Sequence, residues 1–102
     1  MEINDIQHKQ NDRRGIFFLK HGDQTIAELT YSLNDDVMII DHTETQPEHE
    51  GKGIGAKMVE ESYAFAKANN LKINPLCPFA EVVFDRNEDW SDVRVWKFIW
   101  KQ

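Results

Sequence analysis

Three glycines, Gly51, Gly53 and Gly55, occupy alternate positions where a long amphipathic stretch begins. The first backbone N–H groups of a helix have no intrahelical partner, and the helix dipole adds partial positive charge there. Glycine lets the backbone approach a ligand closely and permits positive φ angles. The stretch therefore predicts a cradle for phosphate or pyrophosphate oxygens, to which Lys52 and Lys57 can add charge. An ordinary flexible loop is the alternative, which the patterned helix that follows disfavours.

The spacing of apolar residues before this loop predicts three strands. Residues 15–21, 24–33 and 36–45 are expected to form an antiparallel meander with short turns between them. The centre of the third strand is apolar on both faces, which is typical of an interior strand. The first 14 residues are polar and form either a ragged entry segment or a first edge strand.

The loop is expected to lead into a helix from Gly51 to the Asn69-Asn70 pair, because apolar residues recur at helical spacing. Residues 71–76 form a short strand parallel to the third, which closes a β-α-β crossover. A second helix is expected over residues 79–87, and the tail over residues 90–102 is a short helix or a strand. The apolar stripe of the first helix consists of Ile54, Met58, Val59, Ser62, Phe65 and Ala66, and Phe79, Val82, Val83 and Arg86 share one side of the second. These elements predict an α/β (α+β) fold, a mixed sheet with flanking helices, in one domain over residues 1–102.

The composition limits the expected partners. A formal net charge of -6 argues against a nucleic-acid-binding protein and against binding to a membrane surface. No apolar run is long enough to span a bilayer, and the polar N-terminus lacks the apolar stretch of a signal peptide. The single cysteine, Cys77, excludes an internal disulfide, so a reducing, cytoplasmic location is expected.

Three phosphate-binding motifs can be compared with the glycine series. A Walker loop, G-x-x-x-x-G-K-[ST], does not occur in the sequence. The dinucleotide fingerprint G-x-G-x-x-G/A matches Gly51, Gly53 and Ala56, but a polar loop precedes it and residues 74–77 stand where its acidic residue should be. The stretch PEHEGKGIG at residues 47–55 resembles motif A of the GCN5-related N-acetyltransferases, P-E-x-[RQ]-G-x-G-[IV]-[GA], between a strand and a long helix.

The resemblance extends through IIDHTETQPEHEGKGIGAKMVE and KINPLCPFAEVVFDR, and it looks like the small, single-domain branch of that superfamily. It implies acetyl-CoA (or coenzyme A) as the ligand, with its pyrophosphate held by the amides of the glycine loop, and an amine acceptor of unknown identity. The cofactor-binding residues that it implies are Glu50, Gly51, Lys52, Gly53, Ile54, Gly55 and Ala56, together with Thr43 at the end of the third strand.

Two departures from the family pattern affect this site. Glu50 stands where Arg or Gln is usual, and its carboxylate would repel a pyrophosphate unless it points away, caps the helix or accompanies a different cofactor mode. The full-size enzymes also carry two N-terminal helices beside the acceptor cleft, for which this chain has no room. A more open acceptor site, suited to a protein or peptide, is therefore expected.

Acetyl transfer to an amine requires removal of an amine proton and benefits from a proton for the leaving thiolate. Cys77 precedes Pro78 at an expected helix start, where a lowered pKa would suit it as a covalent acetyl acceptor or as that acid; a buried structural cysteine is the alternative. His42 is a candidate base, with Glu44 orienting it or acting as base itself. A solvated strand end is the alternative for this pair.

Strand alternation places His42 and Glu44 on one face and Asp41 and Thr43 on the other. In the group that the sequence resembles, Phe84-Asp85-Arg86 recurs after the Cys-Pro dipeptide, which implies that Arg86 anchors either its helix or a cofactor phosphate. A solvated cap at this charged helix end is the alternative. The histidines and the cysteine lack the spacing of zinc ligands, so no metal is predicted. The sequence thus favours an acetyl-CoA-dependent N-acetyltransferase, and a non-catalytic CoA- or acyl-CoA-binding module and a protein-interaction domain without a cofactor are the alternatives.

Overall fold

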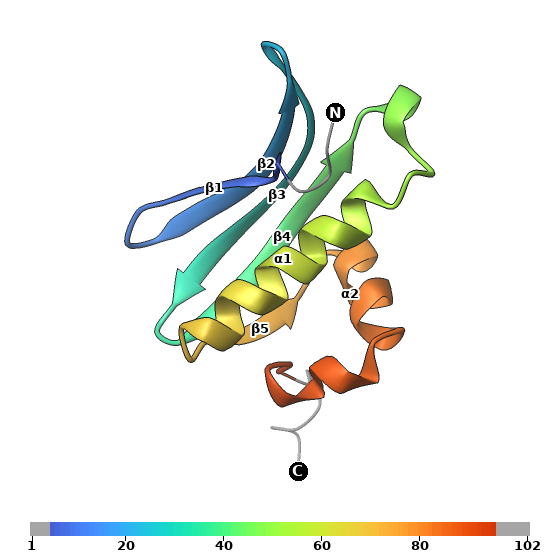
Figure 1. Cartoon of the computed structure of the whole chain (residues 1–102). Coiled ribbons are helices and arrows are strands. Elements are labelled where there is room, and N and C mark those ends of the chain that lie inside the picture. The colour runs from blue at the N-terminus through green and yellow to red at the C-terminus, as the bar shows by residue number, and fades with distance from the viewer. Residues whose placement is uncertain (1–4, 96–102) are drawn as a thin grey trace.

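The computed structural model describes residues 5–95 of the chain. Four strands come first, and they are followed by a helix, a fifth strand and a second helix, with short 3-10 turns after β4 and after α2 (Figure 1). The strands are β1 (Gln7–Gln10), β2 (Arg14–His21), β3 (Gln24–Asn34), β4 (Val37–Thr45) and β5 (Lys72–Pro75), and the helices are α1 (Ile54–Ala68) and α2 (Pro78–Asp85).

The strands form one five-stranded mixed sheet in the order β1-β2-β3-β4-β5. Neighbours from β1 to β4 are antiparallel, and β5 lies parallel to β4 after the crossover through α1. The predicted meander, the parallel final strand and the mixed sheet are confirmed. Because β1 pairs with β2 along its whole length, the N-terminal segment contains an edge strand, which was one of its two expected forms.

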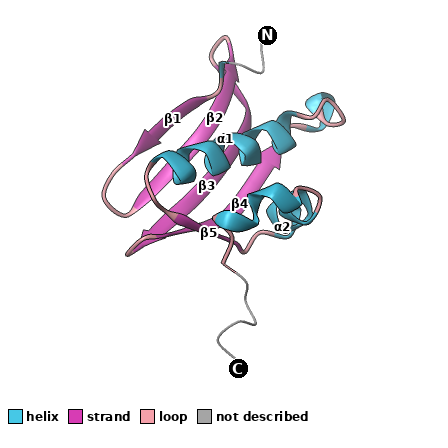
Figure 2. Ribbon diagram, turned by 60° about the horizontal axis from the view of Figure 1, so that its bottom comes forward, coloured by secondary structure: helices cyan, strands magenta, loops and turns pink. Residues whose placement is uncertain are grey.

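One face of the sheet forms the core with both helices. Alternate residues of β2 and β3, among them Phe17, Leu19, Leu29 and Tyr31, are buried on this face. α1 lies across it, and α2 packs beside α1 close to β4 and β5 (Figure 2). The predicted stripe of α1 is buried at Ile54, Met58, Val59, Ser62 and Ala66, and its remaining member, Phe65, is half-buried.

The beginning of α1 differs from the prediction. The helix starts at Ile54 rather than at Gly51, because Gly51 and Gly53 have φ angles of 81° and 78°, which a right-handed helix does not contain. At the other end Asn70, with a φ of 58°, turns the chain away, as expected for the Asn pair. Neither described helix is long and apolar enough to cross a membrane.

The segment after β5 also differs in detail. α2 begins with Pro78 at its first position, as expected, but it ends at Asp85, before the expected end at Asn87. Residues Glu88–Asp92 form a 3-10 turn, and Arg94 makes an isolated parallel bridge to Ile73 of β5. The part of the predicted tail beyond Val95, with its last two tryptophans, lies outside the described residues.

A buried tyrosine ties the edge strand β1 to the core. The Tyr31 hydroxyl lies 2.6 Å from Nε2 of His8 and donates a hydrogen bond to Oε1 of Gln10 at 3.1 Å. The His8 ring stacks on Phe17 with ring centroids 4.1 Å apart. Burial lowers the pKa of His8 and raises the pKa of Tyr31 to about 12, so both groups are neutral near pH 7.

Replacing Gly15 by alanine is expected to destabilise the protein by about 1–3 kcal/mol, because the new Cβ would overlap the ring of Tyr31. That ring cannot move without disturbing its hydrogen bonds to His8 and Gln10. Urea unfolding followed by tryptophan fluorescence measures the change in free energy. A Gly22→Ala variant, in which the new Cβ meets no atom within 4 Å, reports the cost of losing a turn glycine alone. Equal stability of Gly15→Ala and the wild type would contradict the predicted overlap.

Candidate functional site

A cleft of about 690 Å³ opens where β4 and β5 separate. Their pairing ends with Ile40 opposite Pro75, followed by one hydrogen bond from the Cys77 N–H to the Ile40 carbonyl at 2.9 Å. Proline has no N–H with which to continue a ladder, and Pro78 is suited to the first turn of a helix, so the chain leaves the sheet and enters α2. The end of β4 therefore faces α2 across a gap, which the glycine loop closes at one end.

The cleft collects most of the predicted cofactor-binding residues. The end of β4, the glycine loop with the first turn of α1, and one side of α2 form its walls. The predicted cofactor-binding residues that line it are Thr43, Glu50, Gly51, Gly53, Ile54, Gly55 and Ala56, and the predicted catalytic residue Glu44 lines it as well. Lys52, His42 and Cys77 were also predicted, and they lie next to this set without lining the cleft themselves.

The glycine loop, most of which lines the cleft, contains backbone donors without a partner among the described residues. Gly53 is the residue before the first turn of α1, and no side chain caps the helix there. Within the described part of the chain, no protein group accepts a hydrogen bond from the backbone N–H groups of residues 51–56, and Lys57 makes the first bond, to the Gly53 carbonyl at 3.0 Å. A methyl group on Gly51 or Gly53 would meet no atom within 4 Å. Open space, free donors and the positive helix end together suit an anion such as a pyrophosphate.

Gly55 has a different role from the other two glycines. A Cβ at this position would lie 2.8 Å from the ring of Phe79 in α2. The absence of a side chain therefore lets α2 approach the first turn of α1, which brings the second helix to the edge of the cleft. Phe79 keeps 44% of its surface exposed, so it also offers an apolar wall to a ligand.

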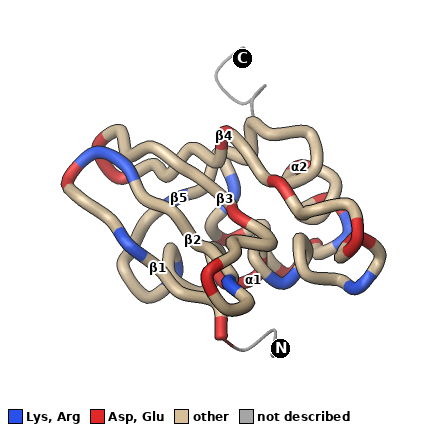
Figure 3. Tube along the Cα trace, turned by 90° about the horizontal axis from the view of Figure 1, so that it is seen from above, with Lys and Arg blue, Asp and Glu red and all other residues tan. Residues whose placement is uncertain are grey.

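The charges around the cleft are unequal. Three carboxylates, those of Glu28, Glu44 and Glu50, line it, and Arg86 is the single lysine or arginine among its described lining residues. Glu50 does not cap α1, which was one of the expected roles for this carboxylate. Figure 3 shows acidic and basic positions interspersed along the described chain rather than gathered into a basic face.

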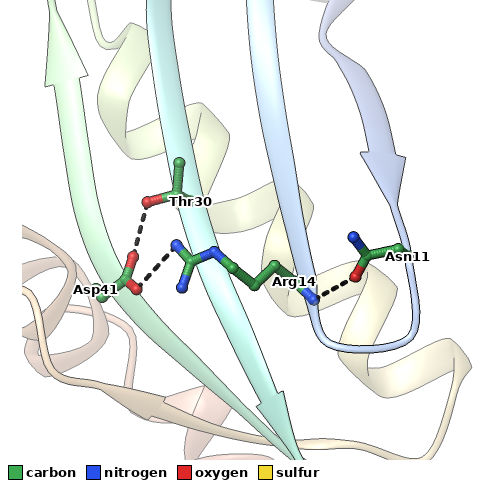
Figure 4. Close-up of polar contacts among 4 residues, drawn as sticks. All are labelled: Asn11, Arg14, Thr30 and Asp41. Carbon is green, nitrogen blue, oxygen red and sulfur yellow. Dashed lines mark hydrogen bonds and ion pairs between the residues drawn. The ribbon is translucent and has the colours of Figure 1, made fainter.

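The end of β4 does not follow the strict alternation that was predicted, because the strand contains a bulge at Asp41. The register with β3 shifts so that Tyr31 pairs with Ile40 and Thr30 with His42, which leaves Asp41 without an opposite residue. Asp41 accepts hydrogen bonds from the Thr30 hydroxyl at 2.7 Å and from the Arg14 guanidinium at 3.2 Å (Figure 4). Because Thr43 turns instead toward Cys77, Asp41 and Thr43 do not share a face as predicted.

His42 and Glu44 share a face, as the alternation predicts. Nε2 of His42 lies 3.4 Å from Oε1 of Glu44, and both side chains are exposed. Glu28 of β3 pairs with Glu44, and the possible ligand atoms of Glu28, His42 and Glu44 lie within 4.8 Å of one another. Exposed carboxylates commonly lie this close without a metal ion, so the prediction of no metal stays a prediction. The arrangement can accept a proton or attract a cationic group.

Cys77 is the residue before the first turn of α2, with 9% of its surface exposed. Its Sγ lies 3.4 Å from Oγ1 of Thr43. Burial raises the pKa of the thiol, but hydrogen bonds from the Thr43 side chain and from the backbone of Ala80, Phe79 and Thr43 outweigh it and hold the pKa below its ordinary value. A larger fraction of this thiol is therefore ionised at neutral pH than in an ordinary cysteine.

Several lining residues were not assigned to the site from the sequence. Glu28 and Thr45 reach it through the pairing of β3 with β4, which the sequence does not specify. Phe79 and Val82 were placed on one side of their helix, and that side faces the cleft. Phe79 and Val82 are three residues apart and so lie on the same face of α2, and this spacing could have indicated from the sequence that both belong to the site.

Replacing Thr43 by valine is expected to raise the pKa of Cys77, because the side-chain hydrogen bond that favours the thiolate is lost. The rate of alkylation by iodoacetamide rises as the thiol ionises, so its midpoint should move to higher pH in the variant. Thr45→Val is the matched control, since Thr45 lines the cleft and makes no contact with Cys77 among the described hydrogen bonds. Identical midpoints in the wild type and Thr43→Val would show that this contact does not set the pKa.

Comparison with known proteins gives a family match over most of the chain. A family model described as GCN5-related N-acetyl-transferase matches residues 16–93, which include the glycine loop, both helices and the cleft. No curated protein matches the chain.

Solved structures with a similar fold come from several bacteria. A GCN5-like protein from Staphylococcus aureus is 29% identical, with a TM-score of 0.65 over 87% of each chain. The ribosomal-protein-S18-alanine N-acetyltransferase from Escherichia coli is 13% identical, with a TM-score of 0.62 over 76% of this chain and 53% of that one. The IAA acetyltransferase from Bacillus cereus is 18% identical, with a TM-score of 0.57 over 72% and 53%. This chain thus spans about half the length of the last two, and these show similarity of fold alone.

Proposed function

The chain belongs to the GCN5-related N-acetyltransferase family, and on that premise we propose that it is an N-acetyltransferase that transfers the acetyl group of acetyl-CoA to an amine. We further propose that it is a cytoplasmic protein of the small, single-domain branch of the family. One sheet and one continuous hydrophobic core among the described residues support a single domain. The single cysteine fits a reducing compartment.

The observation that supports this function best is the row of unpartnered N–H groups at residues 51–56, which opens on the cleft. A pyrophosphate held there would accept hydrogen bonds from the loop and from the first turn of α1. The rest of an extended ligand could then run between the end of β4 and α2, where Phe79 and Val82 offer apolar contact. A thioester at the far end would lie near Thr43 and the separated edge of β4.

The pair of His42 and Glu44 is the proposed proton acceptor. Glu44 lines the cleft, and His42 lies behind it at 3.4 Å. The amine nitrogen attacks the thioester carbonyl, a new C–N bond forms, and the C–S bond breaks to release the thiolate of coenzyme A. The proton that the amine loses passes to this pair, either directly or through water. Glu28 adds negative charge to the same place, so cationic amines such as polyamines or lysine side chains fit the acceptor site electrostatically.

Cys77 offers an alternative, covalent route at the thioester end of the cleft. Its thiolate would form a thioester with the acetyl group and release the thiolate of coenzyme A, and the amine would then take the acetyl group from the cysteine. Direct transfer is the simpler route, because Thr43 rather than Cys77 lines the cleft. Mass spectrometry of the protein after exposure to acetyl-CoA distinguishes the two. Full turnover in Cys77→Ala, with no acetylated cysteine in the wild type, would exclude the covalent route.

A non-catalytic CoA-binding module is the second candidate, and Glu50 favours it. This carboxylate lines the cleft close to the free N–H groups, where it would repel a pyrophosphate. Such repulsion weakens binding and could place the thioester poorly for reaction. Both candidates require coenzyme A in the cleft, so a measurement of coenzyme A binding tests the ligand that they share. A measurement of acetyl transfer then separates the enzyme from the non-catalytic module.

Replacing Gly53 by alanine is expected to weaken the binding of coenzyme A by about tenfold or more, because the strained residue would shift the donors of the loop. Isothermal titration calorimetry measures the affinity. Gly22→Ala is a close control, since Gly22 also has a positive φ, of 63°, and open space around its Cβ, but lies outside the cleft. The site is supported if both variants lose a similar amount of stability but only Gly53→Ala loses affinity for coenzyme A. Absence of any binding by the wild type would overturn the proposed function.

Replacing Glu44 by glutamine is expected to reduce acetyl transfer about 10²-fold or more while leaving the affinity for acetyl-CoA within a few-fold, because the amide cannot accept the proton. Thiol release from acetyl-CoA with a panel of polyamines and lysine peptides measures turnover. Glu48→Gln removes the same charge from an exposed residue that does not line the cleft. Tight binding of acetyl-CoA without turnover for any amine would favour the non-catalytic module.

A further inference from the structure

Arg86 is a cation in the lining of the cleft that no part of the proposed chemistry uses. Arg86 follows the last residue of α2, and its N–H continues the helical turn through hydrogen bonds to the carbonyls of Val82 at 3.1 Å and Val83 at 3.2 Å. Its backbone is therefore held by the helix, and its side chain extends from a fixed point. Arg86 lines the cleft together with Phe79, Val82 and Val83, which precede it on the same side of α2.

Arg86 has no acidic partner among the described residues. None of the described ion pairs or side-chain hydrogen bonds includes it. The carboxylate nearest in sequence, that of Asp85, is bound to the Arg94 guanidinium at 2.8 Å instead. A guanidinium carries five N–H donors in a planar fork, which matches two oxygens of a phosphate.

The position of Arg86 differs from that of the glycine loop. Phe79 contacts the first turn of α1 through Gly55, and Arg86 lies seven residues further along α2. At the rise of an α-helix this spacing corresponds to about 10 Å. The cleft therefore offers two separate places for negative charge, the free N–H groups of the loop and the guanidinium of Arg86, with apolar side chains between them.

We propose that Arg86 binds the 3′-phosphate of coenzyme A and makes the protein select coenzyme A over its 3′-dephospho form. This inference rests on the proposed function, because it assumes that the pyrophosphate occupies the glycine loop. Coenzyme A carries its 3′-phosphate apart from the pyrophosphate, on the ribose, and so presents two anionic groups. With three carboxylates around the cleft, a phosphate monoester would be repelled without a local cation. Arg86 supplies that cation and gives the adenosine end of the ligand a defined place.

Calorimetric titration of coenzyme A and of 3′-dephospho-coenzyme A into the full-length protein tests this assignment. The wild type is expected to bind coenzyme A about tenfold more tightly, as is typical of one charge-assisted bidentate contact. Arg86→Gln should bind both ligands with the affinity that the wild type has for the dephospho form. Arg86→Lys should keep part of the preference, because it retains the charge without the fork.

Arg13→Gln is the matched control. Arg13 is exposed between β1 and β2 and does not line the cleft, so the variant loses the same charge and should keep the full preference. Equal affinities for the two ligands in the wild type, or an undiminished preference in Arg86→Gln, would overturn the assignment of Arg86 and leave the proposed function standing. Failure of the wild type to bind either ligand would overturn both.

Discussion

Parallel pairing between β4 and β5 ends at Ile40 and Pro75, and the candidate site depends on the separation of the strands beyond that point. Pro75 cannot extend the ladder, and Pro78 begins a helix at once, so α2 takes the place that a continued β5 would have filled. β4 continues beside β3 as far as Thr45. Its last residues consequently face a cleft rather than a strand, and polar side chains on them remain available for chemistry.

The two helices complete the cleft through glycines that act in different ways. Gly51 and Gly53 allow a backbone with positive φ, which turns consecutive N–H groups away from any protein acceptor in the described chain. Gly55 instead removes a side chain that would collide with Phe79, and so sets how closely α2 approaches α1. Such unpaired donors must be hydrated or bound by a ligand. The same short stretch thus creates the anion-binding surface and places the opposite wall, where Arg86 and the apolar residues of α2 lie.

Much of the fold could be predicted because it depends on local patterns. Alternation in β3 and the apolar stripe from Ile54 to Ala66 specify which faces are buried, and Asn70 specifies where α1 ends. The bulge at Asp41 could not be predicted, because it depends on the register of two strands and on partners from Thr30 and Arg14. For the same reason Glu28 was not included in the candidate site, although it lies opposite Glu44. The start of α1 was placed at Gly51 because the sequence does not distinguish a helical glycine from one with a positive φ.

The amino-acid sequence by itself determined the order of the strands and helices, the glycine loop before α1 and the family to which that loop points. These features depend on residue types and spacings within a few turns or strands, where steric limits on the backbone and burial of apolar faces act locally. Only the tertiary structure decided that Thr43 contacts Cys77, that Glu28 joins His42 and Glu44, and that Arg86 shares a cleft with the glycine loop. Each of these arrangements brings together residues that are far apart in the chain. They therefore form only when the sheet register and the packing of α2 against α1 are established.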